Sequence, residues 1–178
     1  EVFLLDTRFF AGTEPSPFDK DRPSLLGKRQ WKWLRRQLKA STAPFKVLAC
    51  GMVWNDAVRP GKLDHWGTYP HERQALFEFI GDEKISGIIL VGGDVHRTRV
   101  LQHDSVESAG YKIPEFITSP VHGGVIENAK VDHPGLVRDF GQPNTFLLMT
   151  VQGATRPNKL KAGFLDKAGR VIFEFALA

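Results

Sequence analysis

Residues 85–96 read ISGIILVGGDVH, and this stretch says most about the fold. Its apolar run is typical of a strand that is buried on both faces, as in a parallel sheet covered by other layers. Gly92 and Gly93 end the run, and Asp94 and His96 follow directly. The stretch therefore predicts an α/β protein with polar residues placed just beyond a buried strand.

The residues before this strand alternate between strand and helix patterns. Residues 2–5 and 45–50 are short apolar runs, whereas residues 25–39 and 70–80 repeat apolar residues at helical spacing. Right-handed crossovers make the three strands parallel, so their carboxyl ends meet at one edge of the sheet, where ligands of open α/β sheets bind. Residues 51–69 form a long polar loop, which is uncommon unless it is functional.

Beyond residue 96 the pattern changes to strands without long helices between them. The residues Asp166-Lys167-Ala168-Gly169 are a strong hairpin signal between the last two strands. We therefore expect a mixed sheet and a terminal β-hairpin. The expected strands are Arg99–Gln102, Phe116–Thr118, Phe146–Gln152, Leu160–Leu165 and Val171–Phe175.

The composition is that of one ordinary globular domain. The chain has 178 residues, of which 42% are hydrophobic and 25% charged, and its net charge is +4. No apolar run approaches the about 20 residues that a membrane-spanning helix needs. The single cysteine, Cys50, excludes an intrachain disulfide framework, and we expect it in the core. The chain starts at Glu1 rather than Met, so we expect a processed chain or part of a longer protein.

The chemistry-bearing motifs of several other protein classes are absent. The sequence has no Gly-x-Ser-x-Gly elbow, Walker loop or dinucleotide fingerprint. Basic residues gather between Lys28 and Arg36, on the first expected helix; we favour a solvated helix face over a nucleic-acid patch. We therefore expect no nucleic-acid partner, and metal-assisted hydrolysis fits the remaining polar residues best.

Asp94 and His96 form the sharpest local feature. If the chain stays extended, two residues separated by one valine point to a common side. A carboxylate with an imidazole suits a borderline cation such as Fe, Mn, Zn or Co. The alternative is an aspartate that ends a strand next to a surface histidine, and the two interpretations are evenly balanced.

The loop over residues 51–69 supplies a second polar group. Asn55 and the aspartates of the loop, Asp56 and Asp64, are suited to ligate a hard metal, and Arg59 or Arg73 to hold a phosphate through two hydrogen bonds. The alternative interpretation is structural, with Asp64 making turns and the tryptophans anchoring the loop by packing.

Two further side chains have both a structural and a functional interpretation. Arg8 leaves the first strand with Asp6; the two form a buried ion pair, which we favour, or Arg8 faces the substrate. His122 precedes two glycines, which permit close approach of a ligand. Three histidines are expected at the surface: His71, His103 and His133.

Taken together, these motifs resemble the PhoD-like (alkaline phosphatase D) family of metallophosphoesterases. The most specific is Gly93-Asp94-Val95-His96, and the resemblance spans about residues 2–125. The other matching pieces, in chain order, are FLLDTR at residues 3–8, Leu26-Gly27 with Gln30, Trp33-Leu34, Leu38 with Ser41, the Asp64 and Trp66 loop, the Tyr69 and Arg73 helix, and Thr118-Ser119-Pro120.

The resemblance implies a four-layer αββα sandwich, with residues 1–178 as the C-terminal part of a single metallophosphoesterase domain. It implies hydrolysis of small phosphomonoesters or phosphodiesters at a site of two divalent or trivalent metal ions (Fe, Ca, Mn or Zn), and a secreted or periplasmic location. The family's other metal-binding motifs lie upstream of the matching segment, so the N-terminal part of the same protein is the expected partner. The alternative is a non-catalytic, phosphoesterase-like binding domain.

The resemblance and the motifs described above together give individual residues expected roles. Ligand roles carry over to the aspartate and histidine of the Gly-Asp-Val-His motif, and arginines would balance the charge that develops on phosphorus. The expected metal ligands are Asp94 and His96, the expected catalytic residues are Arg8, Asn55 and Arg73, and the expected substrate contacts are Trp54, Asp64 and His122.

Overall fold

The structure is a computed structural model that describes residues 1–153 and 157–177. Its strands are β1 (Val2–Leu4), β2 (Lys46–Ala49), β3 (Ile88–Gly92), β4 (Thr98–Gln102), β5 (Pro114–Ile117), β6 (Leu136–Phe140), β7 (Phe146–Gln152), β8 (Lys159–Leu165) and β9 (Val171–Leu177). Its helices are α1 (Gly27–Ala40), α2 (Pro70–Asp82) and the short α3 (Val106–Ala109), with 3-10 turns at Trp66–Thr68 and Glu127–Ala129.

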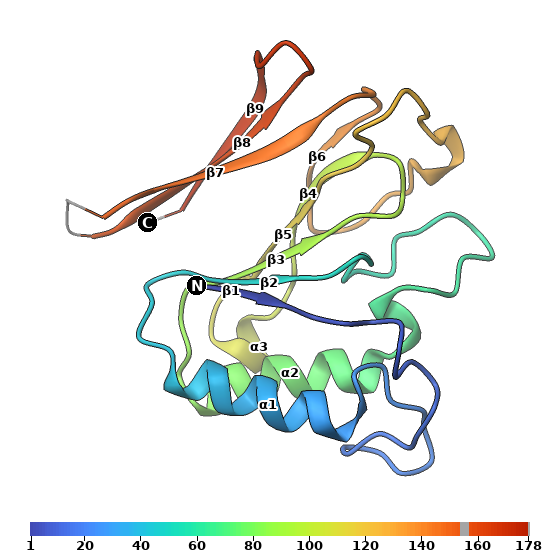
Figure 1. Cartoon of the computed structure of the whole chain (residues 1–178), viewed down its shortest axis with the longest axis vertical. Coiled ribbons are helices and arrows are strands. Elements are labelled where there is room, and N and C mark those ends of the chain that lie inside the picture. Colours follow the sequence, from blue (N-terminus) through green and yellow to red (C-terminus); the bar gives the residue numbers. More distant parts are fainter. Residues whose placement is uncertain (154–156, 178) are drawn as a thin grey trace.

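These elements form three layers (Figure 1). A six-stranded sheet in the order β1-β2-β3-β5-β4-β6 lies in the middle. Helices α1 and α2 cover one face of it, and the three-stranded sheet β7-β8-β9 lies on the other side. The expected α/β fold with two packed sheets is therefore confirmed, and the described residues supply three of the four expected layers. None of the helices in this part of the chain is both long and apolar enough to cross a membrane.

Strand β3 is covered on both faces, as its apolar run predicts. It pairs in parallel with β2 and with β5. Ile88 and Leu90 belong to the core between the sheet and the helices, together with Leu34 of α1. Ile89 points the other way and packs in a second core with Phe164 of β8. Because both faces are apolar, polar side chains can follow only beyond the strand's end.

The second half of the chain contains two elements that the sequence does not predict. Strand β6 pairs antiparallel with β4 at the edge of the large sheet, and a register shift lies between Val100 and Leu101. Helix α3 has four residues, too few to show a helical repeat. The expected hairpin is confirmed: β8 and β9 are antiparallel, and Gly169 in the turn has a φ of 77°. Strand β7 pairs antiparallel with β8 and completes the second sheet.

Helix α1 is fixed at its start by a buried carboxylate from α2. Glu72 is 0% exposed. Its oxygens accept hydrogen bonds from the hydroxyls of Ser16 and Ser24 (2.7 Å each), from the Leu25 backbone N–H (3.0 Å) and from the Trp31 indole N–H (2.8 Å). The negative charge also suits the positive end of the helix dipole. One side chain thus joins α1, α2 and the loop that precedes α1.

We predict that Glu72→Gln lowers the free energy of unfolding by about 3 kcal/mol, because the new amide N–H₂ leaves buried donors without an acceptor. Urea unfolding followed by circular dichroism measures the change. Glu78→Gln on the exposed side of α2 is the matched control and should change stability little. Equal stability of the two variants would contradict the structural role given to Glu72.

Cys50 directly follows β2 and packs against the main core, as expected. Burial raises the pKa of its thiol to about 11, although hydrogen bonds involving Met52 and Trp66 oppose the rise. The reactive thiolate is therefore a very small fraction of Cys50 at pH 8.

We predict that iodoacetamide at pH 8 modifies Cys50 about a hundredfold more slowly in the folded protein than in urea, where the pKa returns to about 8.5. Mass spectrometry of timed samples measures both rates. Similar rates in the two states would show that the thiol is not shielded.

Candidate functional site

The loops that follow the parallel strands meet at one edge of the large sheet. Arg8 follows β1, Lys62 and Asp64 lie in the loop between β2 and α2, and Asp94 follows β3. Hydrogen bonds join all four side chains. The segments after β1 and β3 therefore converge as expected, whereas the loop after β2 contributes Lys62 and Asp64 rather than residues 51–56. We call these four residues the rim cluster.

The rim cluster alternates positive and negative charges. The Lys62 Nζ donates to Asp64 Oδ1 (2.7 Å) and to Asp94 Oδ2 (2.6 Å). The Arg8 Nη2 donates to Asp64 Oδ2 (3.0 Å) and reaches Asp94 Oδ2 at 3.5 Å. Partial burial by itself would raise the pKa of Asp64, but the hydrogen bonds from Lys62 and Arg8 lower it to about 2. Asp64 is therefore a permanent anion at neutral pH.

Arg8 does not form the favoured buried ion pair with Asp6. The Asp6 carboxylate instead accepts hydrogen bonds from the backbone N–H groups of Phe9 (2.9 Å) and Arg8 (2.8 Å), and these bonds lower its pKa. The Arg8 side chain is 58% exposed and turns toward Asp64 and Asp94. The structure thus supports the alternative in which Arg8 faces the site.

The chain between Gly93 and His96 is not extended, which corrects the geometric premise drawn from the sequence. Asp94 and His96 both have positive φ angles, 71° and 52°. Gly92 packs so closely against the carbonyl of Met52 that a Cβ there would collide with it. The chain therefore turns sharply on leaving β3, and the two side chains meet different neighbours.

The His96 imidazole lies against His122, from the loop that follows β5. Their ring centroids are 4.7 Å apart in an edge-to-face arrangement. The His96 backbone N–H also donates to the Ser119 hydroxyl (3.1 Å), which ties the two loops together. His96 is half-buried and His122 exposed. The structure thus brings His122 to the edge that carries the rim cluster.

These donors fit one side of a metal site. A carboxylate and imidazoles suit borderline cations, and Asp94 and His122 are exposed. Among residues 1–153 and 157–177, however, no three His, Cys, Asp or Glu side chains are placed to hold one ion. The described residues therefore do not complete a metal site by themselves.

Trp54 and Asn55 are fully buried, so their contacts are structural. The Trp54 indole stacks on Trp66 with centroids 4.2 Å apart and donates to the Val91 carbonyl (3.1 Å). The Asn55 side chain donates to Glu115 and accepts from the Ala57 N–H (2.8 Å). In this arrangement neither side chain is placed to contact substrate or metal directly.

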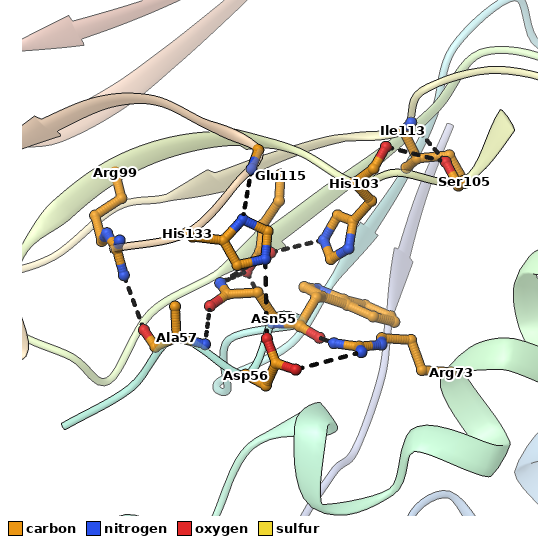
Figure 2. Close-up of polar contacts among 12 residues, drawn as sticks. Asn55, Asp56, Ala57, Arg73, Arg99, His103, Ser105, Ile113, Glu115 and His133 are labelled. Atoms are coloured by element: carbon orange, nitrogen blue, oxygen red, sulfur yellow. Dashed lines mark hydrogen bonds and ion pairs between the residues drawn. The ribbon is translucent and has the colours of Figure 1, made fainter. Parts of the chain in front are cut away.

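Arg73 also faces the protein rather than the rim. Its Nη1 donates to the Trp54 carbonyl (2.8 Å), and its Nη2 lies 3.9 Å from Asp56 Oδ2 (Figure 2). The alternative in which Arg73 clamps a phosphate is therefore not supported, and the side chain holds the loop. Arg59 is exposed.

Figure 2 shows a buried network centred on Glu115 of β5, which sequence reasoning missed. Glu115 is 0% exposed and bonds to Asn55, to the Trp54 N–H and to His103 Nε2 (2.8 Å). The expected surface position of His103 is wrong, because only 5% of this residue is exposed. A charged residue inside the short apolar run PEFI was the signal available in the sequence.

Comparisons with known proteins agree with this architecture. The chain is 29% identical over 155 residues to "Alkaline phosphatase D" of Bacillus subtilis (strain 168), a match that covers 76% of this chain and 27% of that protein. It also superimposes on the solved "Structure of PhoD" with a TM-score of 0.70 and 21% identity, which covers 99% of this chain and 38% of that one. The chain thus spans well under half the length of either relative.

The family description "PhoD-like phosphatase" matches residues 1–169, which is almost the whole chain. The fold, the rim cluster and the Gly-Asp-Val-His turn are therefore found together with the sequence pattern of one family. The chain belongs to the PhoD-like phosphatase family.

Proposed function

We propose that this chain supplies one wall of the active site of a metal-dependent phosphoesterase that acts on small phosphomonoesters or phosphodiesters. The observation that carries the proposal is the rim cluster, in which two cations and two carboxylates from three loops meet beyond the parallel strands. The similarity to a protein named alkaline phosphatase D supports the same reaction class.

Arg8 and Lys62 are the anion-binding groups of the proposed site. Both already hold carboxylate oxygens at hydrogen-bonding distance, so their donors are oriented toward the rim. A phosphate ester offers oxygens of the same kind. The Arg8 side chain is 58% exposed and can reach them, whereas the Lys62 side chain is 6% exposed and would bind one only where its Nζ exchanges a carboxylate oxygen for a phosphate oxygen. Fixed positive charges at this place also stabilise the charge that grows on phosphorus during hydrolysis.

Asp94 and His96, with His122 beside them, are the residues that would hold a cation. Such an ion would supply polarisation of the phosphate and a bound water molecule acidic enough to ionise near neutral pH. The remaining ligands would come from a part of a longer protein outside this chain, since the match to the Bacillus relative covers 27% of that protein. Asp64, held beside Asp94 by Lys62 and Arg8, supplies fixed negative charge rather than a proton.

A non-catalytic binding domain is the second candidate. It is favoured by one observation, that no three metal-binding side chains gather within the described residues. Such a domain would bind phosphate esters through Arg8 and Lys62 without turning them over.

We predict that Asp94→Asn and His96→Gln each lower kcat/KM for p-nitrophenyl phosphate and bis-p-nitrophenyl phosphate at least about a hundredfold in the full-length protein. Metal content by mass spectrometry should fall in both variants. Asp21→Asn, an exposed carboxylate of the loop before α1, is the matched control and should leave both readouts unchanged. Full activity of either site variant, or activity that survives removal of metal by a chelator, would refute the proposal.

We predict that Lys62→Met raises KM for the phosphomonoester about tenfold, the expected effect of losing one charge-assisted hydrogen bond to the substrate. Steady-state kinetics at constant ionic strength measure KM. Lys20→Met removes an exposed lysine elsewhere and should not change it. An unchanged KM in Lys62→Met would remove Lys62 from substrate binding.

A further inference from the structure

We infer that Glu115 is the positioning residue that fixes the loop bearing Lys62 and Asp64, and that it acts on the reaction through them. The inference rests on the proposed function for the role of the loop, whereas the contacts of Glu115 stand on the structure alone. Glu115 lies inside β5, an interior strand of the large sheet.

The Glu115 carboxylate is buried among hydrogen-bond donors. Its Oε1 accepts from the Trp54 backbone N–H (2.8 Å) and from Asn55 Nδ2 (3.1 Å). Its Oε2 accepts from Asn55 Nδ2 (3.0 Å) and is 2.8 Å from His103 Nε2. A buried carboxylate is costly unless such donors surround it, so its presence in a strand interior indicates a specific task.

That task is to hold the first part of the loop, residues 54–57. Asn55 connects Glu115 to Ala57, because its side-chain oxygen accepts a hydrogen bond from the Ala57 N–H (2.8 Å). Two arginines hold the neighbouring carbonyls: Arg73 bonds to Trp54 O and Arg99 to Ala57 O, both at 2.8 Å. Side chains from β5, β4 and α2 thus fix four consecutive residues that have no regular secondary structure.

The far end of the loop is held against this first part. Trp66 stacks on Trp54, and its backbone N–H donates to the Val53 carbonyl (3.0 Å). A Cβ at Gly67 would collide with Asp56, so these two backbone segments are in close contact. The intervening residues include Lys62 and Asp64. Glu115 therefore holds one end of the segment that supplies half of the rim cluster, and the other end packs against the residues that Glu115 holds.

Glutamine at this position would have nearly the same shape as glutamate, but it would present a hydrogen-bond donor in place of one acceptor oxygen. A carboxylate is acceptor-only, and it meets donors from Trp54 and Asn55. The amide N–H₂ of glutamine would take the place of one acceptor oxygen, so at least one of the three hydrogen bonds from Trp54 and Asn55 would be lost. Glu115→Gln therefore tests positioning with a minimal change in volume.

The first test is hydrogen exchange of the full-length protein, measured by mass spectrometry. Glu115→Gln should speed exchange at least about tenfold in peptides covering residues 53–66, with little change in α1. Glu72→Gln is the matched control, since Glu72 is equally buried but holds the start of α1; it should give the opposite pattern. Unchanged exchange over residues 53–66 in Glu115→Gln would overturn the inference.

The second test separates positioning from a simple loss of folded protein. Glu115→Gln should raise both KM for p-nitrophenyl phosphate and the inhibition constant of inorganic phosphate about tenfold, because Lys62 is displaced. A purely structural role would reduce the amount of active enzyme and leave both constants unchanged, as expected for Glu72→Gln. Constants equal to those of the wild type would overturn the inference. A wild-type protein without phosphoesterase activity would refute the proposed function instead, and the exchange experiment distinguishes the two failures.

Discussion

The coverage of strand β3 is the constraint on which the rest of the structure depends. Helices α1 and α2 lie on one side of it and the second sheet on the other, so it has no face for a polar side chain. Its neighbours β2 and β5 run parallel to it, which brings the loops after these strands to the same edge. The position of the site follows from this arrangement before any particular site residue is considered.

Two buried carboxylates then organise the parts of the chain that have no regular structure. Glu72 accepts hydrogen bonds from hydroxyls, backbone N–H groups and an indole N–H at the start of α1. Glu115 accepts hydrogen bonds from donors of the loop after β2. Each accepts several hydrogen bonds from segments far away in the sequence. An ionised acceptor makes these bonds stronger than neutral ones, and this strength suits it to fix an irregular loop.

The sequence was sufficient for the features that depend on local patterns. Apolar periodicity predicted most strands and both long helices, and the end of β3 pointed to Asp94 and His96. It could not give the side-chain partners, because these depend on loop conformation. The positive φ angles of Asp94 and His96 cannot be read from the residue pattern. The expectation of an extended chain after β3 was therefore wrong. Lys62 and Glu115 went unrecognised for a similar reason, since their roles exist only after distant segments meet.

The aromatic contacts of the loop have an optical consequence. Trp54 and Trp66 are nearly parallel, with an interplanar angle of 15°, and Trp31 of α1 stands edge-on to Trp66 at 6.3 Å. Indole chromophores at such separations couple their electronic transitions and share excitation energy. We therefore expect the ultraviolet spectrum of the protein to report on the segment beside its candidate site without an attached dye.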